Sequence, residues 1–282
     1  MRMKKLTVLF IFLLILCPVS AGVISLRTTV TSDILTKDKT VVKVEILNLG
    51  DESAYDVQIS LVTEDFTTDK INIKELKPNE PFEGILNVTL KKTIIEGKYP
   101  VVVLVGYADA NGYPFSSVSP TFIVYKTPST SKVSGLIPEI SLTGKESKKL
   151  TLSMRNLDDE EHDLNVKLIL PREIKVVDDE KKFSIGPKDE ESLDFEVSSL
   201  SAISGSTYAI LASMEYEDED LHYTSFANGI IRIDGGTTPK QEPEETSTLA
   251  YIVLFISIVF VLIYAYPKYI RRGKKLEWKK NR

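Results

Sequence analysis

Cysteine, histidine and tryptophan are scarce in this chain of 282 residues, which has one cysteine, two histidines and one tryptophan. A single cysteine cannot form an internal disulfide or supply the paired thiolates of a cysteine-based zinc site. Basic charge is also in deficit, because 35 Lys and Arg face 40 Asp and Glu, and this argues against a nucleic-acid-binding protein. The 43% of apolar residues is enough for folded cores, so we expect one to three domains rather than a disordered chain.

Motifs of the common enzyme classes are also missing. The sequence has no G-x-S-x-G elbow, no H-E-x-x-H pair, no Walker loop and no G-x-G-x-x-G turn. Only His162 and His222 offer a general base, and each lies next to acidic residues. We interpret both as exposed, solvated side chains. The sequence thus predicts a protein that is not an enzyme, and we assign no catalytic or cofactor-binding residue.

The first 21 residues have the three parts of a secretory signal peptide. A basic start with Arg2, Lys4 and Lys5 precedes an apolar run of twelve residues, and small residues lead to a cleavage site after Ala21. Twelve residues span only about 18 Å as a helix, which is shorter than a hydrocarbon core of about 30 Å. Lipidation of Cys17 is not favoured, because the residues before it are not small.

A second apolar segment, residues 249–266, has no charge over 18 residues and spans about 27 Å as a helix, enough to cross a bilayer once. Tyr251 and Tyr264 lie near its two ends, as in an aromatic belt. The tail at 267–282 has eight basic residues and one acidic residue, which predicts a cytoplasmic location. Together the two ends predict a single-pass membrane protein that contacts lipid through 249–266 and has its N-terminal domains outside the cell.

The exterior part carries 24 basic and 39 acidic residues, a formal net charge of −15. This excess of negative charge disfavours nucleic acid and anionic lipid as its partners. Apolar residues in this part recur at every second position, as in strands with one buried face, and turns rich in Asn, Gly, Pro and Asp separate the runs. These observations predict an all-β exterior. The runs are centred on Val44, Ile59, Val88, Leu152, Val166 and Phe195.

The two halves of the exterior match each other at an offset near 108 residues. The segment 45–59 aligns with 153–166, which places Asn48 opposite Asn156 and leaves one residue fewer in the second turn. Gly97 and Gly205 keep nearly the same offset further along. A duplicated unit of about a hundred residues with roughly seven strands predicts two tandem immunoglobulin-like β-sandwich domains.

The order of an apolar strand, an Asn-x-Gly turn and an alternating strand resembles the CARDB-like and NEW3-type immunoglobulin-fold modules of archaeal and bacterial surface proteins. Leu76-Lys-Pro78 and Gly97-Lys-Tyr99 are further marks of this resemblance, which covers roughly residues 23–234. The layout of the whole chain is similar to that of archaeal S-layer-domain membrane proteins. The resemblance implies binding or scaffolding at the cell surface and supplies no catalytic residue. Asp158 stands where the pattern has glycine, so we expect the second turn to differ.

These inferences divide the chain into seven segments. They are a signal peptide (1–21), a first immunoglobulin-like sandwich (22–126), a connector (127–132), a second immunoglobulin-like sandwich (133–234), a stalk rich in Thr, Pro and Glu (235–248), a transmembrane helix (249–266) and a basic tail (267–282).

Acidic clusters raise the question of calcium. The clusters at 158–161, 178–180, 189–191 and 215–220 offer the oxygen ligands that Ca²⁺ takes, but none has EF-hand spacing. We interpret them as solvated charge, with structural Ca²⁺ as the alternative, and assign no metal ligand. The Asp109-Ala-Asn111-Gly112 segment is interpreted as a hairpin turn.

Three further features bear on ligands. Asn87 starts the sequon Asn-Val-Thr on the polar face of a predicted strand and is a candidate N-glycosylation site. Aromatic residues around two corresponding hairpins are candidates for ligand contact, although packing in a core is the favoured interpretation. They are Tyr107, Tyr113, Phe115, Tyr216 and Tyr223.

The sequence therefore predicts a non-enzymatic, membrane-anchored cell-surface protein whose tandem domains serve envelope scaffolding or bind an envelope or membrane protein. One alternative is an accessory subunit of a membrane complex such as a transporter. The other is a carbohydrate-binding surface module, for which a glycan is the ligand.

Overall fold

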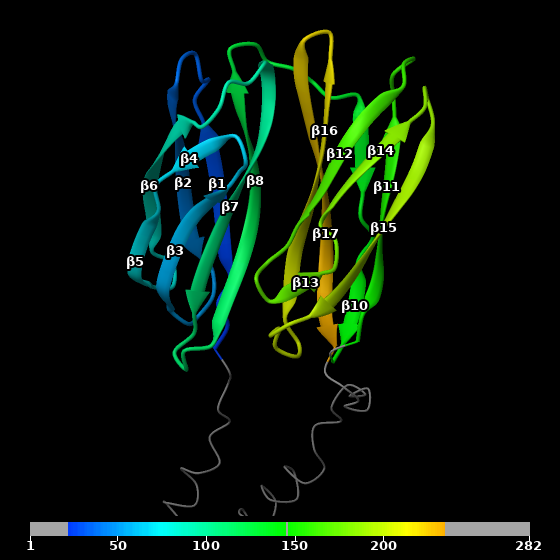
Figure 1. Cartoon of the computed structure of the whole chain (residues 1–282). Helices are drawn as coiled ribbons and strands as arrows, with labels where there is room; N and C mark the ends of the chain where they lie inside the picture. Colours follow the sequence, from blue (N-terminus) through cyan, green and yellow to red (C-terminus); the bar gives the residue numbers. More distant parts are fainter. Residues whose placement is uncertain (1–21, 145, 235–282) are drawn as a thin grey trace, which may run out of the picture. The chain divides into compact units, whose positions relative to one another are not determined.

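The computed structural model describes residues 22–144 and 146–234, and every regular element in these ranges is a β-strand (Figure 1). The all-β prediction is therefore confirmed. The predicted signal peptide, stalk, transmembrane helix and basic tail lie outside the described residues. Within the ranges that the structure describes, no helix has the length and apolar character that a membrane crossing requires.

The first half of the described chain, which we call the first sandwich, has eight strands. Its strands are β1 (Leu26–Ser32), β2 (Lys39–Asn48), β3 (Ala54–Val62), β4 (Phe66–Thr68), β5 (Ile71–Leu76), β6 (Pro81–Leu90), β7 (Glu96–Ala108) and β8 (Pro114–Tyr125). The second half, called the second sandwich, has nine. Its strands are β9 (Val133–Leu136), β10 (Ile140–Thr143), β11 (Lys148–Asn156), β12 (His162–Ile169), β13 (Ile174–Val176), β14 (Glu180–Ile185), β15 (Glu190–Ser199), β16 (Thr207–Asp218) and β17 (Leu221–Asp234).

Each half encloses its own hydrophobic core between two sheets. In the first sandwich the sheet β1-β2-β6-β4 packs on strands β5, β3, β7 and β8. In the second, the sheet β13-β15-β11-β9 packs on strands β14, β12, β16 and β17, with β10 parallel to β17. The period of two decides which residues enter the core, since Val42, Val44 and Ile46 are at most 2% exposed while Lys43 and Glu45 between them are exposed.

The structure repeats where the sequence repeats. Strand β2 pairs with β6 as β11 pairs with β15, and β3 pairs with β5 and β7 as β12 pairs with β14 and β16. Asn48 and Asn156 are both fully buried, and each donates its Nδ2–H at 2.7 Å to the carbonyl oxygen four residues ahead, on Glu52 and Glu160 respectively. One buried amide thus closes the same turn in both sandwiches.

The two turns are alike, so the difference expected from Asp158 is wrong. The Oδ1 of Asn48 accepts a hydrogen bond from the Gly50 N–H at 3.0 Å, and the Oδ1 of Asn156 accepts one from the Asp158 N–H at 2.8 Å. Glycine at position 50 meets a different need, because a Cβ there would lie 1.9 Å from the carbonyl oxygen of Val23. The close approach of the chain before β1, rather than the turn itself, excludes a side chain.

The one-residue difference between the repeats lies in a strand, so its placement in the turn is also wrong. The first residues of β3 and β12 pair with Leu76 and Ile185 in the same way. Asp56 then forms a β-bulge at a φ of 49°, and the register of β3 against β7 shifts between Tyr55 and Gln58. Strand β12 pairs with β16 without such a shift. The sequence gives no sign of this bulge, because an aspartate occurs in ordinary turns as well as at positive φ.

The two sandwiches meet through β7, β8, β16 and β17. Leu221 and His222 of β17 lie parallel to Glu96 and Gly97 of β7, and this pairing joins strands of both sandwiches into one nine-stranded sheet. Since β16 is antiparallel to β17, the equivalent strands β7 and β16 run in opposite directions. Strand β16 also contacts β8, the counterpart of β17. We call the contact between the sandwiches the joint. Approximate two-fold symmetry therefore relates the two sandwiches at the joint.

A small third core lies in the middle of the joint. It is formed by Val102, Val118 and Leu211, which are at most 5% exposed, with Phe226 packed against them. Val102 and Leu211 occupy equivalent places in β7 and β16, each one residue before the inward-facing Val103 or Ala212. Val118 and Phe226 lie opposite equivalent residues of those strands. The same positions of the two repeats thus meet each other.

The joint gives the described chain two distinct ends (Figure 1). At the connector end, residues 126–132 cross from β8 to β9 beside His222, whose carbonyl oxygen accepts a hydrogen bond from the Ser129 hydroxyl at 2.6 Å. At the terminal end lie the start of β1 at Leu26 and the end of β17 at Asp234. The chain therefore enters and leaves the paired sandwiches at the same end.

Candidate functional site

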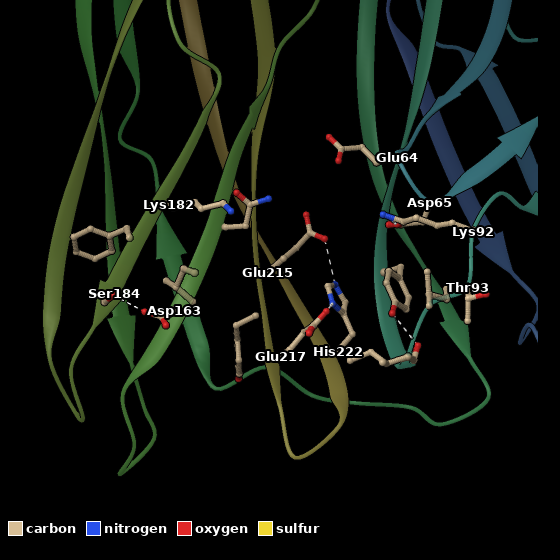
Figure 2. Close-up of a pocket in the computed structure, with 17 residues that line it drawn as sticks. Glu64, Asp65, Lys92, Thr93, Asp163, Lys182, Ser184, Glu215, Glu217 and His222 are labelled. Atoms are coloured by element: carbon tan, nitrogen blue, oxygen red, sulfur yellow. Dashed lines mark hydrogen bonds and ion pairs between the residues drawn. The ribbon is translucent and has the colours of Figure 1, made fainter.

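A groove of about 900 Å³ opens between the sandwiches at the connector end (Figure 2). The first sandwich contributes the residues after β3, the residues before β7, and Tyr99 of β7. The second contributes β12, β14, β16 and the start of β17. The groove exists only because both sandwiches are held together, and it is the candidate functional site.

The wall of the groove is built around His222. Its ring stacks on that of Tyr99, with ring centroids 4.1 Å apart and an angle of 1° between the planes. Its Nε2 lies 3.2 Å from Oε2 of Glu215, and because a carboxylate only accepts, this nitrogen carries the hydrogen. Glu217 lies further away, with Oε1 3.9 Å from Nδ1. His222 is 8% exposed, so it positions the two sandwiches more than it presents a ring to solvent.

Tyr99 is fixed as firmly as its histidine neighbour. Its hydroxyl donates to the carbonyl oxygen of Ile95 at 2.8 Å, and burial, together with the nearby carboxylates, raises the pKa of its phenol far above the usual value. The phenol therefore stays neutral over the whole physiological range. It provides a hydrogen-bonded, apolar platform for His222 rather than an acid or a base.

Two ion pairs hold three of the charged side chains that line the groove. Lys92 lies 2.8 Å from Asp65, and this hydrogen bond raises the pKa of Lys92. Lys167 forms an ion pair with Glu64, whose pKa is lowered by that hydrogen bond although burial opposes the effect. The pair joins β12 to the segment after β3, so it also bridges the two sandwiches. These pairs leave a polar lining with moderate net negative charge.

The hydroxyl and histidine side chains of the groove form hydrogen bonds with carboxylates. The Ser184 hydroxyl donates to Asp163, and the hydrogen-bonding partners of His162 and His222 are the carboxylates of Asp158 and Glu215. Among residues 22–144 and 146–234, no three His, Cys, Asp or Glu side chains are grouped so that they hold a metal ion. The arrangement is suited to recognising a polar surface.

The interpretation of both histidines as solvated is wrong. His162 is 5% exposed, stacks on Tyr216 at 4.3 Å between ring centroids, and lies 3.3 Å from Asp158. The acidic neighbours suggested that the histidine is exposed to solvent, but the alternation of apolar residues along the strand is the better predictor of its direction. His162 is in phase with the buried Leu164 and Val166 of β12, which predicts an inward direction.

The five candidate aromatic residues do not form one surface. Tyr107, which packs against the core of the first sandwich, stacks on Phe115 at 5.7 Å between ring centroids. Tyr216 and Tyr223, which pack in the core of the second sandwich, stack at 5.0 Å. Tyr216 also reaches the groove. Only Tyr113, which is 57% exposed, stands free at the tip of the β7–β8 hairpin.

The polar candidates lie away from the centre of the groove. Asn87 is exposed on β6, and its Nδ2–H donates to Asp69 at 2.7 Å. The predicted hairpin turn at 109–112 is confirmed, since Asp109 Oδ1 accepts hydrogen bonds from the N–H groups of Asn111 and Tyr113, both at 2.9 Å. Of the acidic clusters, only 215–220 reaches the groove, through Glu215 and Glu217.

The residues that build the groove were missed because they are far apart in the sequence. Glu64, Lys92 and Tyr99 come from three segments of the first sandwich and meet the second only through the joint. Continuous apolar runs were the sequence feature that could have predicted the contact between the sandwiches. Residues 101–105 of β7 and 210–212 of β16 do not alternate, which is typical of strands covered on both faces.

Comparisons with known proteins add little to this geometry. No family model matches the chain, and no curated protein sequence matches it. A Salmonella alpha-2-macroglobulin is similar over 74% of this chain and 16% of its own, with 14% identity and a TM-score of 0.32. The chain thus spans about a sixth of that protein's length. A Porphyromonas gingivalis protein of unknown function is similar over 73% of this chain and 99% of its own, with 13% identity and a TM-score of 0.31.

A third similar structure is a cohesin–dockerin complex from Clostridium thermocellum. It matches 39% of this chain and 97% of its own, with 13% identity and a TM-score of 0.29. TM-scores at this level carry no argument about the activity or partners of this chain.

Proposed function

We propose that the chain is a membrane-anchored, non-enzymatic surface protein whose two immunoglobulin-like sandwiches form one binding unit in the cell envelope. The observation that carries the proposal is the position of the ends. Leu26 and Asp234 both lie at the terminal end, and the predicted membrane span follows Asp234 in the sequence. The groove lies at the opposite, connector end, and it is the surface that we propose for a partner.

The joint supports a scaffold rather than a flexible pair of modules. Strand pairing, the third core and the stack of Tyr99 on His222 all cross between the sandwiches. Thr224 adds a hydrogen bond from its hydroxyl to the carbonyl oxygen of Lys98 at 2.6 Å. A binding site that spans two fixed bodies loses little conformational freedom when it binds, so this construction favours recognition of a folded protein.

The proposed partner is an envelope or membrane protein that meets the connector end. The polar, partly paired lining of the groove suits the rim of a protein interface better than a small-molecule pocket, which is mostly apolar. The resemblance to CARDB-like modules and to S-layer-domain proteins suggests the same class of partner. We extend the proposal to a location on the outer surface of the cell membrane.

The experiment is crosslinking from defined positions in native cells. The mature chain is predicted to have no cysteine, so single cysteines provide unique attachment points for a thiol-reactive crosslinker. Thr93→Cys places the crosslinker in the groove, and Asn111→Cys places it in the hairpin at the terminal end. Both positions are exposed. The protein is then purified through a tag on its C-terminal tail, and its crosslinked partners are identified by mass spectrometry.

A surface protein captured through Thr93→Cys and not through Asn111→Cys is the expected result. Capture through Asn111→Cys alone would contradict the proposed role of the groove. An integral membrane complex that co-purifies in fixed ratio without either crosslink would favour an accessory subunit instead.

A further inference from the structure

Glu173 is a carboxyl group buried in the joint at the terminal end. It lies between β12 and β13 and is 2% exposed. The hydroxyl of Ser116, on β8 of the other sandwich, donates to its Oε2 at 2.7 Å. The same hydroxyl oxygen accepts a hydrogen bond from the Arg172 N–H at 2.8 Å. Ser116 of the first sandwich is thus hydrogen-bonded to Glu173 of the second, and the Glu173 side chain is charged when it is ionised.

The first sandwich has an acidic residue at the equivalent place, and it is neutralised. Asp65 precedes β4 as Glu173 precedes β13, and its carbonyl oxygen accepts from the Lys91 N–H as that of Glu173 accepts from the Leu200 N–H, at 2.9 and 2.8 Å. Asp65 has a cation, since Lys92 Nζ lies 2.8 Å from it. The residue after Leu200 is a serine, so the second sandwich lacks the corresponding lysine.

The remaining groups that face Glu173 do not replace that cation. Arg172 is adjacent in sequence, but its Nη1 is directed to β7, where it lies 3.0 Å from the point that a Cβ on Gly106 would occupy. None of the ion pairs within the described ranges includes Glu173. Tyr107 of β7 and Tyr208 of β16 also interact with it, and burial raises the pKa of both phenols, so both are neutral.

We propose that Glu173 is a proton-binding site of the joint: its neutral carboxyl group holds the two sandwiches together, and its ionisation at higher pH loosens the contact. A buried carboxylate without a cation is strongly disfavoured, whereas a protonated carboxyl keeps its hydrogen bonds to Ser116. Opening the joint would return the charge to water. The contact between the sandwiches is therefore linked to pH through Glu173 at the terminal end, whereas at the connector end Lys92 lies beside the equivalent residue Asp65.

The sign of the linkage follows from the direction of the pKa. Burial raises the pKa of Glu173, although the hydrogen bond from Ser116 and the charge of Arg172 oppose the rise. The stabilising effect is fully present below the pKa of an unfolded glutamate, about 4.3, and is lost as the pH rises through the raised value. The joint thus tightens in mildly acidic conditions.

Hydrogen–deuterium exchange on the full chain in detergent micelles tests the proposal. The probe is the Arg172 amide, which is protected by Ser116 across the joint. Wild type and Glu173→Gln are compared at the same pH, which cancels the intrinsic pH dependence of exchange. At pH 8 we expect this amide to exchange faster in the wild type, roughly tenfold for each unit by which the pKa is raised. At pH 5 the difference should shrink.

A second variant keeps the proposal testable if Glu173→Gln fails to fold. Ser201→Lys supplies the missing cation while Glu173 remains, and it should slow exchange of the Arg172 amide at pH 8. Glu196→Gln, at an exposed position of β15, is the control and should follow the wild type.

Two results would overturn the proposal. The first is an Arg172 amide whose exchange is the same in wild type, Glu173→Gln and Ser201→Lys at pH 8. The second is a parallel change in the amides of β2, which lies in the core of the first sandwich and reports on global unfolding instead of the joint.

Discussion

Asn48 and Asn156 show at the residue scale why the repeated turns have the same form. Each side chain is fully buried and uses its donor and its acceptor at once, bonding forward to a carbonyl oxygen and accepting from an N–H two residues ahead. The Nδ2 of Asn156 reaches Gly186 O as well, at 3.0 Å, and so connects the turn to the end of β14. Only an amide side chain of this length satisfies all of these groups.

Replacing Asn156 by alanine should lower the free energy of unfolding by about 2–4 kcal/mol, because it leaves several buried backbone groups without partners. Asn156→Asp should lose at least as much, because its buried carboxylate still accepts from the Asp158 N–H but faces the carbonyl oxygens of Glu160 and Gly186 without a donor. Leu157→Ala, at a residue 49% exposed in the same turn, is the control and should change stability little. Urea unfolding measures all three. Equal losses for Asn156→Ala and Leu157→Ala would show that the amide does not hold the turn.

Tyr107 gives a second prediction at this scale, on alkaline stability. Burial raises its pKa to about 12, so the neutral phenol stabilises the fold fully below the unfolded pKa of 10 and loses this effect as the pH rises through about 12. From pH 9 to 12, wild type should therefore lose about 2 kcal/mol more than Tyr107→Phe, which has no phenol to ionise. Urea unfolding at the two pH values provides the comparison. Tyr113→Phe, at the exposed hairpin tip, should keep the wild-type profile, and a similar flattening in this variant would refute the role of Tyr107.

At the scale of the strand, Gly97 allows β7 of the first sandwich to pair with β17 of the second in one sheet. Its φ is +140°, and a Cβ would lie 2.2 Å from the carbonyl oxygen of His222 in the neighbouring strand β17. Its counterpart Gly205 has a φ of +85° but open space around it. Both positions have a positive φ that favours glycine, and only at Gly97 would a side chain also clash with the neighbouring strand.

Alanine substitutions at Gly97 and Gly205 separate the effect of backbone strain from the effect of the clash. Gly97→Ala and Gly205→Ala both introduce backbone strain of about 1–3 kcal/mol. Only Gly97→Ala should also break the parallel pairing of β7 with β17, and we expect it to increase exchange at the Leu221 and His222 amides. Hydrogen–deuterium exchange on both variants checks this. Comparable exchange of those amides in the two variants would mean that strain alone accounts for the effect.

Strands were the elements that the sequence predicted well, because one buried face imposes a period of two. The runs around Val44 and Leu152 lie in β2 and β11 with the expected alternation. The inward direction of His162 could be obtained from the alternation in β12, but the bulge at Asp56 and the stacking of His222 on Tyr99 could not. They depend on which backbone or ring lies across the sheet, and polar neighbours give no measure of that.

The joint belongs to the scale of the whole molecule, and there the sequence was least informative. The duplication and its length were visible, but the way in which the repeats meet depends on contacts between residues about a hundred positions apart, such as Val102 and Leu211. The apolar runs at 101–105 and 210–212 were the local signs, because they leave no polar face for solvent. The groove depends on the joint and was hidden for the same reason.

Neighbouring residues of β7 provide the test at this scale. Val102 packs in the third core between the sandwiches, whereas Val103 packs in the core of the first sandwich, and both are at most 1% exposed. An aspartate at either position is a buried, unpaired charge that costs several kcal/mol. The charge at 102 reaches water when the joint opens, while the charge at 103 reaches water only when the sandwich unfolds.

Val102→Asp should therefore leave both sandwiches folded and separate them, and Leu211→Asp should do the same because its place in the repeat is equivalent. Limited proteolysis reports the separation, since the connector is held against His222 by Ser129 in the closed joint and becomes cleavable in the open one. Val103→Asp should instead give cleavage throughout the first sandwich and lose its cooperative thermal transition. A connector that stays resistant in Val102→Asp and Leu211→Asp would mean that strand pairing and the ends of the joint suffice to hold the sandwiches together without the third core.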